Sequence, residues 1–205
     1  MTATLSSWSI VIAVLFVPGY PAQQAGRFEE AKRTGLQHLK NGRYDKAAAN
    51  FEEVWEQDRS DPSVAEYLAL AYLNGTERPS GVSKKVLQLM ELSIAAGGKA
   101  SFVVHHSHEK LTWLQGRGLN NYCSGTLSIS PGHLAFVGEA KDKTRDHSFD
   151  SMRDEIRSIL PAIDDRSGTF IIKTKSRNYQ MAPRTWDRTD SELILLLSKK
   201  YLNVK

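Results

Sequence analysis

The sequence lacks the features by which most enzymes and metalloproteins are identified. One cysteine in 205 residues excludes an internal disulfide, and Cys123 is expected to be a buried strand residue. Neither an H-E-x-x-H segment nor a G-x-S-x-G turn occurs. Gly116 and Gly118 stand in Q-G-R-G, without the Lys-Ser/Thr pair of a phosphate loop. The sequence therefore predicts a protein that is not an enzyme and uses no cofactor.

A strong excess of one charge is also missing. The formal net charge is +4, from 27 Lys and Arg against 23 Asp and Glu. Residues 27–98 carry 10 basic and 11 acidic side chains, whereas residues 99–205 carry 17 and 12. The basic excess thus lies in the second half, and it falls short of a nucleic-acid footprint. No nucleic-acid partner is expected.

The first 26 residues contain no charged side chain. Trp8 to Val17 form a nearly continuous apolar run that is too short to span a bilayer, and Pro18-Gly19 follow it. Because Tyr20-Pro21-Ala22-Gln23 is similar to a cleavage region, residues 1–22 are predicted to be the signal peptide of an exported protein, periplasmic or secreted. No Lys or Arg precedes the apolar run, so an uncleaved membrane anchor and a buried N-terminal helix are the alternatives.

Residues 27–98 have the apolar spacing of four helices in two hairpins. Asn41-Gly42 predicts the first turn, after a helix that ends at Lys40. Asp61-Pro62 predicts the start of a third helix, which Gly75 ends. The second and fourth helices are expected over residues 44–57 and 82–96.

These hairpins resemble two tetratricopeptide repeats over residues 27–96. The first hairpin has small and aromatic residues where the family uses them, and the second fits at two positions, although the family's early Trp is absent from both. The matching residues are Gly35, Tyr44, Ala47, Phe51, Ala69 and Tyr72. Gly35 and Ala69 are 34 residues apart, which is the period of such repeats. Because the family typically binds peptides and proteins, the resemblance implies a partner of that kind.

The expected partner-binding site is the concave face of the hairpins. Polar side chains there would hold the backbone of an extended or helical peptide. The candidate contacts are Gln37, Lys40, Asn41, Asn50, Tyr67 and Asn74. Two repeats fall short of the usual three for independent stability, so another part of the chain is expected to cover the open end.

The periodicity changes to that of strands from Ala100 onward. In the segment 122–130, alternate residues predict one apolar face and one face of Ser124, Thr126 and Ser128. Pro131-Gly132 predicts the turn of a hairpin. Residues 187–202 have helical spacing, with Thr189 and Asp190 as candidate caps.

The predicted fold class is therefore α+β, with helical hairpins followed by an antiparallel β-barrel or sheet that a C-terminal helix closes. Over residues 99–205 the order resembles the pleckstrin-homology-like fold and its GRAM relatives. The resemblance rests on the alternation in 122–130, on Ser148-Phe149 before Ile156, on the strand 170–172 and on the terminal helix. Similar domains often bind anionic lipid headgroups or acidic peptides.

A basic patch is the candidate for such a ligand. Lys173, Lys175 and Arg177 alternate along a predicted strand and should share its solvent face, and Arg184 extends the patch. They are the predicted site for an anionic membrane surface or an acidic ligand. The alternative is an edge strand that lysine protects against pairing with another chain.

Two other clusters are weaker candidates for chemistry. His106 and His108 would share one strand face, but neither they nor the adjacent His105 and Glu109 have the spacing of a zinc site, so no metal is expected. Ser128, Ser130 and Asp150 could form a triad with a histidine, yet no strand–turn–helix motif places a nucleophile. The leading hypothesis is thus a non-enzymatic interaction module, and the alternative is a membrane-surface adaptor.

Overall fold

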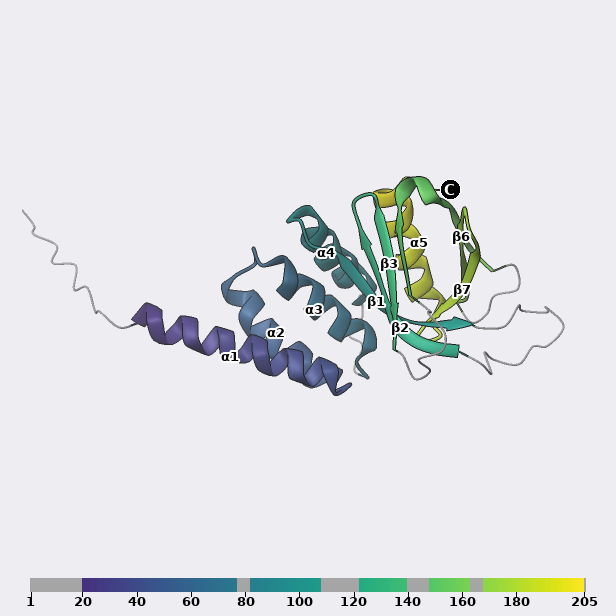
Figure 1. The fold of residues 1–205 in the computed structure, drawn as a ribbon. Coiled ribbons are helices and arrows are strands. Elements are labelled where there is room, and N and C mark those ends of the chain that lie inside the picture. Colours follow the sequence, from purple (N-terminus) through teal and green to yellow (C-terminus); the bar gives the residue numbers. More distant parts are fainter. Residues whose placement is uncertain (1–19, 77–81, 108–121, 140–147, 163–167, 205) are drawn as a thin grey trace, which may run out of the picture.

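The computed structural model describes residues 20–76, 82–107, 122–139, 148–162 and 168–204. These residues confirm the α+β class, because helices precede an antiparallel sheet and a helix follows it. Figure 1 shows an elongated molecule with α1–α4 at one end and the sheet at the other. The helices are α1 (Tyr20–Lys40), α2 (Tyr44–Gln57), α3 (Pro62–Asn74), α4 (Val82–Ala95) and α5 (Arg188–Leu202).

In the first hairpin, α1 and α2 cross where a small residue of one helix faces a large residue of the other. A Cβ at Gly35 of α1 would lie 2.8 Å from the ring of Phe51 on α2, so only glycine allows this approach. Phe51 is fully buried, and Ala47 packs beside it on the same helix. Gly42 adopts a left-handed φ of 67°, which turns the chain after α1 at low conformational cost. The predicted turn and the bounds of α2 are confirmed.

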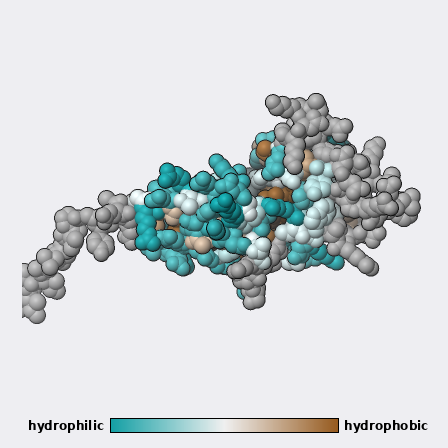
Figure 2. Space-filling model, turned by 90° about the horizontal axis from the view of Figure 1, so that it is seen from below, coloured by the Kyte–Doolittle hydropathy of each residue, from teal (hydrophilic) through white to brown (hydrophobic). Residues whose placement is uncertain are grey.

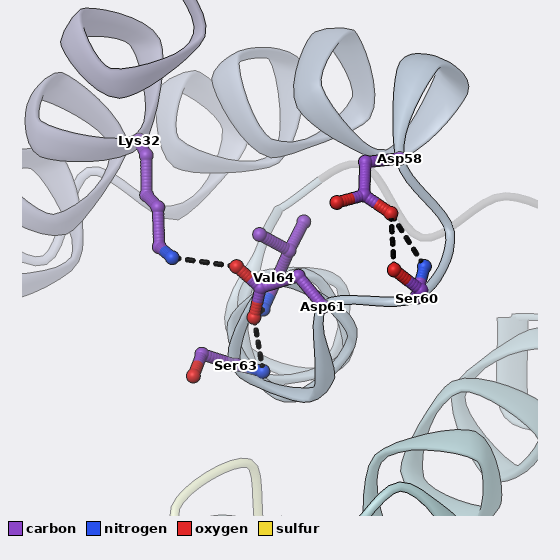
Figure 3. A network of polar contacts seen from close by, with 6 residues as sticks. All are labelled: Lys32, Asp58, Ser60, Asp61, Ser63 and Val64. Atoms are coloured by element: carbon purple, nitrogen blue, oxygen red, sulfur yellow. Dashed lines mark hydrogen bonds and ion pairs between the residues drawn. The ribbon is translucent and has the colours of Figure 1, made fainter. Parts of the chain in front are cut away.

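Asp61 joins the two hairpins and starts the second one. Its carboxylate accepts hydrogen bonds from the backbone N–H of Ser63 at 2.8 Å and from Lys32 Nζ of α1 at 2.6 Å (Figure 3). Burial raises the pKa of Asp61, but the bonds from Lys32 and Ser63 outweigh it and hold that pKa below its usual value. The Asp-Pro start signal in the sequence therefore also fixes how α1 lies against α3.

In the described ranges, seven strands form one curved antiparallel sheet in the order β4-β3-β2-β1-β7-β6-β5. Among the described residues β4 and β5 do not pair, so the sheet is open, and of the predicted barrel or sheet the structure has the sheet. The strand bounds are β1 (Ala100–Ser107), β2 (Tyr122–Ser130), β3 (His133–Gly138), β4 (Phe149–Met152), β5 (Ile156–Pro161), β6 (Phe170–Thr174) and β7 (Asn178–Pro183).

The two faces of the sheet differ as the alternation in 122–130 predicted. The inner face is apolar and α5 packs against it (Figure 1). Its buried residues include Phe102, Val104, Leu127, Ile129, Phe136, Ile172 and Met181. Asp187 caps α5 by accepting a hydrogen bond from the Thr189 N–H at 2.8 Å, so the expected caps Thr189 and Asp190 are wrong.

The outer face of the sheet meets the second hairpin through polar groups. Glu66 of α3 is only 6% exposed, and its carboxylate accepts a hydrogen bond from Ser101 Oγ of β1 at 2.5 Å. Ser101 Oγ also lies 3.2 Å from Ser128 Oγ of β2, and Lys99 Nζ lies 4.0 Å from the carboxylate. The sheet thereby covers one side of the hairpins.

None of the helices in the described ranges is both long enough and apolar enough to cross a membrane. Residues 1–19, on which most of the predicted signal peptide falls, lie outside those ranges. Helix α1 begins at Tyr20, so cleavage after Ala22 would leave it starting at Gln23.

Candidate functional site

A cleft of about 570 Å³ lies where the first hairpin meets the outer face of the sheet. Its walls come from the end of α1, the start of α2, α3, strands β1 and β2, and the segments that follow β3 and β7. The lining residues are Leu39, Lys40, Gly42, Tyr44, Leu70, Val103, His105, Ser124, Thr126, Glu139 and Arg184. In the view from below, hydrophilic residues cover most of the helical half, and hydrophobic surface shows where the helices meet the sheet (Figure 2).

The turn at Gly42 brings Lys40 and Tyr44 to the cleft. Its hydrogen bonds, Gly42 N–H to Leu39 O at 3.0 Å and Arg43 N–H to His38 O at 2.9 Å, end α1 and start α2 beside the sheet. Arg184 approaches from the opposite wall, because its N–H donates to Val103 O at 3.0 Å and continues the pairing of β7 with β1. The two halves of the molecule thus each supply a cation.

Arg184 bridges the two walls. Its guanidinium lies over the Tyr44 ring, 4.8 Å from the centroid, and donates a hydrogen bond to the Tyr44 hydroxyl. The Tyr44 hydroxyl takes one hydrogen bond from the planar guanidinium, which has five N–H donors in all. The other donors are not used by Tyr44. Among the described residues neither Arg184 nor Lys40 has a carboxylate within ion-pair distance.

His105 lies on the sheet wall of the cleft with an aromatic cluster behind it. Its Nδ1 is 3.1 Å from Ser124 Oγ, and its ring lies 4.4 Å from Tyr122 and 5.3 Å from Trp186, measured between centroids. Burial lowers the pKa of His105, and the positive charge of Arg184 lowers it further. The imidazole is therefore neutral near pH 7.

Trp186 occupies a backbone conformation that is rare for a bulky residue. Its φ is 55°, in the left-handed region, which costs about 1–3 kcal/mol for a residue with a Cβ. The N–H of Trp186 donates to Pro183 O at 2.9 Å, which fixes this turn between β7 and α5. The strained turn directs the indole onto His105.

Glu139 is the acidic residue of the cleft. Its backbone N–H donates to Ser124 O at 2.7 Å, which extends the β2–β3 pairing by one residue. Its charge raises the pKa of His105, whereas that of Arg184 lowers it, so both charges act on the same imidazole. The cleft therefore has two cations and one anion around a neutral ring.

The arrangement offers several kinds of non-covalent contact to a bound segment. Within the described ranges no three His, Cys, Asp or Glu side chains come together as metal ligands. Ser124, the hydroxyl nearest to a cleft histidine, lies against the Nδ1 of a ring whose burial disfavours protonation. A cleft with hydroxyls, cations and aromatic rings instead offers hydrogen bonds, charge and stacking to a bound segment.

The predicted partner-binding residues differ in their surroundings. Lys40 lines the cleft, and Gln37 and Asn41 are exposed near the same end of α1. The amides of Asn50 and Asn74 donate to backbone carbonyls of their own helices, Lys46 O and Leu70 O, both at 2.8 Å. Tyr67 packs on the Phe51 ring at 5.6 Å. Of the six, only Lys40 belongs to the cleft.

The predicted basic strand face is not formed. Strand β6 ends at Thr174, so Lys175 and Arg177 lie in the turn that follows and not on the strand with Lys173. Lys175 Nζ is 3.6 Å from Asp154 Oδ2, and the Arg177 guanidinium covers the Tyr179 ring on the inner face at 4.5 Å. Arg184 alone of the predicted anionic-ligand residues lines the cleft.

The histidine cluster is also divided. His105 points to the outer face, whereas His106 lies on the inner face near Phe136 and Tyr179, with its Nδ1 3.9 Å from Cys123 Sγ. His108 and Glu109 lie outside the described residues. In the sequence, His105 was a candidate only as a metal ligand, and no signal pointed to its place in the cleft.

The remaining serine candidates lie apart from the cleft. Ser128 Oγ faces Ser101, and Asp150 pairs with the partly buried His133, which lies opposite Ser130 in the β2–β3 register. Asp150 keeps most of its side chain in solvent, so nothing shields this group from water. A shallow hollow of about 630 Å³ also runs along α1, but its walls come from that one helix, and Lys32 within it is already paired with Asp61.

Tyr44, Glu139 and Trp186 were not identified as site residues from the sequence. They come from the start of α2, the end of β3 and the turn after β7, and no motif or spacing relates these segments. Only the docking of the helical hairpins on the sheet brings these segments near one another.

Comparisons with known proteins do not assign this chain to a family. No protein-family model matches it, and no curated protein does. The solved C-terminal domain of an unknown protein from Leishmania infantum is similar over 46% of this chain and 77% of its own, with 19% identity and a TM-score of 0.29. A likeness this low places no constraint on function.

Proposed function

We propose that this protein is a non-enzymatic interaction module that binds a peptide segment of a protein partner in the cleft between the first hairpin and the sheet. The observation that carries the proposal is that Lys40 and Arg184 both line that cleft. The two residues belong to different halves of the chain. A cleft of about 570 Å³ is in the range of small-ligand sites and holds a few side chains of a peptide.

The chemistry of the walls supports a peptide. Ser124 and Thr126 present hydroxyls from adjacent positions of the outer face, and both are only partly buried. Hydroxyls of this kind hydrogen-bond backbone amides and carbonyls without selecting one side chain. The 34-residue period is further support, because the resemblance to tetratricopeptide repeats that it carries implies a peptide or protein partner.

The membrane-surface adaptor has less support. It required Lys173, Lys175 and Arg177 on one solvent face, and these side chains point in different directions. Export of the protein remains a proposal that rests on residues 1–22. The intact mass of protein recovered from the medium or periplasm would report whether that segment has been removed.

A displayed library of random dodecapeptides tests the function directly. We expect the purified protein to enrich a set of peptides, and Thr126→Trp, which fills the cleft from its sheet wall, to abolish their binding. Lys199→Trp, on the exposed face of α5, is the matched control and should bind as the unmodified protein does. Failure to enrich any peptide, or binding that survives Thr126→Trp, would overturn the proposal.

A further inference from the structure

Two surfaces with different chemistry meet at His105. The exposed cations Lys40 and Arg184 line the cleft together with His105. The rings of Tyr122 and Trp186 lie outside the cleft lining and pack on His105, and these three rings form an aromatic shelf beside the cleft. The rings of Tyr122 and Trp186 meet edge to face, with centroids 6.2 Å apart. We propose that the cleft selects a partner segment in which an acidic side chain binds Lys40 and Arg184 while a neighbouring aromatic or large apolar side chain packs on the aromatic shelf.

The positive charges of Arg184 and Lys40 account for the acidic side chain of the proposed partner segment. Arg184 is oriented by its stacking on Tyr44 and its bond to the Tyr44 hydroxyl, so its planar fork is already held in place before a ligand arrives. A fixed guanidinium suits a carboxylate, which it can hold with two parallel hydrogen bonds. Lys40 contributes a second charge from the hairpin wall. Neither cation has a carboxylate partner among the described residues, so a ligand would not have to displace one.

The aromatic shelf accounts for the aromatic or apolar side chain of the proposed partner segment. Tyr122 keeps 46% of its surface exposed, so a partner side chain can reach its ring. Trp186 holds its indole on His105 from a left-handed backbone position that glycine would occupy at lower cost. Because His105 is neutral, the shelf adds a stacking surface rather than a third cation. Exposed aromatic rings held rigidly are typical anchors for a partner side chain.

Glu139 limits where the acidic residue can lie. It lines the same cleft and repels a second carboxylate, so a segment with acidic residues on both flanks is disfavoured. The selected pattern is therefore one acidic residue next to one aromatic or apolar residue, and not a general acidic stretch. This inference rests on the proposed peptide-binding function and names the chemistry of the partner.

The dodecapeptide library also tests this specificity. We expect enriched peptides to contain an acidic residue within a few positions of an aromatic or large apolar one. Reversing both charges, with Lys40→Glu and Arg184→Glu, should weaken those peptides by about tenfold or more and should make the variant enrich basic residues instead. A purely structural role for Arg184 would lower all binding without reversing the preference. Lys199→Glu on α5 is the control and should leave the preference unchanged.

Two more variants separate the parts of the cleft. Glu139→Gln should strengthen the acidic peptides, which is the opposite sign to the charge reversal. Trp186→Gly fits the left-handed backbone and should lose the apolar preference while keeping the acidic one. Thermal melts of each variant check folding, and Lys40→Glu alone, on the exposed end of α1, replaces the double variant if that one does not fold.

The outcomes are distinct. Enrichment of peptides without an acidic preference, or a preference that the double reversal does not change, would overturn this inference and leave the proposed function standing. No enrichment at all would overturn both. If vesicles of phosphatidylglycerol bind the protein, and lose that binding on the double reversal, while no peptide is enriched, the cleft belongs to a lipid headgroup and the peptide assignment is wrong.

Discussion

Two buried contacts hold elements of this molecule together, and they differ in chemistry. The crossing of α1 and α2 in the first hairpin is apolar, whereas the junction between α3 and the sheet is polar. At the crossing, Gly35 admits the ring of Phe51 and the contact is apolar throughout. At the junction, the Glu66 carboxylate lies between helix and sheet and depends on the hydroxyl of Ser101. Gly35 and Phe51 at the crossing are 16 positions apart in the sequence. Glu66 and Ser101 at the junction are 35 positions apart.

This difference shows two ways of fixing one element against another. An apolar crossing gains free energy from burial and close packing, and almost any shape-compatible apolar pair would supply it. A buried polar junction gains little net free energy, but it allows only the arrangement that satisfies its hydrogen bonds. The junction therefore sets the position of the hairpins on the sheet, and hence the width of the cleft beside it.

The largest expected effect is at the apolar crossing. Phe51→Ala removes a fully buried ring and should lower the free energy of unfolding by about 3–5 kcal/mol in urea titrations followed by circular dichroism. Gly35→Leu in the same chain refills the space and should recover part of the loss, although alone it overpacks the crossing by about 1–3 kcal/mol. A loss below about 1 kcal/mol for Phe51→Ala would show that this crossing does not hold the hairpin.

Substitutions at the polar junction should lower the free energy of unfolding by less than Phe51→Ala does, and a double substitution should be less harmful than a single one. Ser101→Val leaves the buried Glu66 carboxylate without its close donor and should cost about 1–3 kcal/mol. Adding Glu66→Leu removes the orphaned acceptor, so the double variant should be more stable than Ser101→Val alone. Equal stabilities would mean that water reaches the carboxylate and that the junction is not dry.

The cap of α3 is expected to contribute about 1 kcal/mol. Asp61→Ala removes both the hydrogen bond to the Ser63 N–H and the contact with Lys32, and should cost about 0.5–2 kcal/mol in the same titration. Asp61→Asn keeps a capping oxygen and loses the charge, so it should cost only a few tenths. If the two variants are equally destabilised, the ion pair and not the cap would be the main contribution.

The smallest effect is a pH dependence at Glu66. Burial raises the pKa of Glu66, although the bond from Ser101 and the charge of Lys99 act in the opposite direction. A carboxyl with a raised folded-state pKa binds more protons when folded, so it favours folding most at or below its unfolded pKa and loses that contribution as pH rises through the folded one. Glu66→Gln should therefore raise Tm relative to the unmodified protein at pH 7, by about 2–4 °C if the charge costs on the order of 1 kcal/mol.

The same comparison at pH 4 is the control for Glu66. There the carboxyl is largely protonated in both states, so the two proteins should melt at nearly the same temperature. Comparing the pair of melts at each pH removes the contributions of other acids, such as Asp61, whose pKa is lowered and whose stabilisation is lost as pH falls. A difference that is larger at pH 4 than at pH 7 would contradict the assignment.

The helices and most strands were predictable because their signals are local. The spacing of 44–57, the Asp61-Pro62 start and the alternation of 122–130 each describe a few consecutive residues, and the structure has these elements at those places. Strand β5 was missed, since its sequence I-R-S-I-L-P holds an exposed Arg157 and ends in proline, which weakens the alternation. The face of Lys173, Lys175 and Arg177 was wrong because a turn interrupts the pattern after Thr174.

The sequence by itself determined the α+β class, the two hairpins and the apolar inner face of the sheet, because helix and strand periods are properties of neighbouring residues. The tertiary structure alone decided that the sheet stays open and that Glu66 meets Ser101. It also decided that Lys40, Arg184 and His105 line one cleft. Such contacts depend on how two folded halves dock, and docking is set by shape and buried hydrogen bonds between distant segments. No short stretch of the chain carries that information.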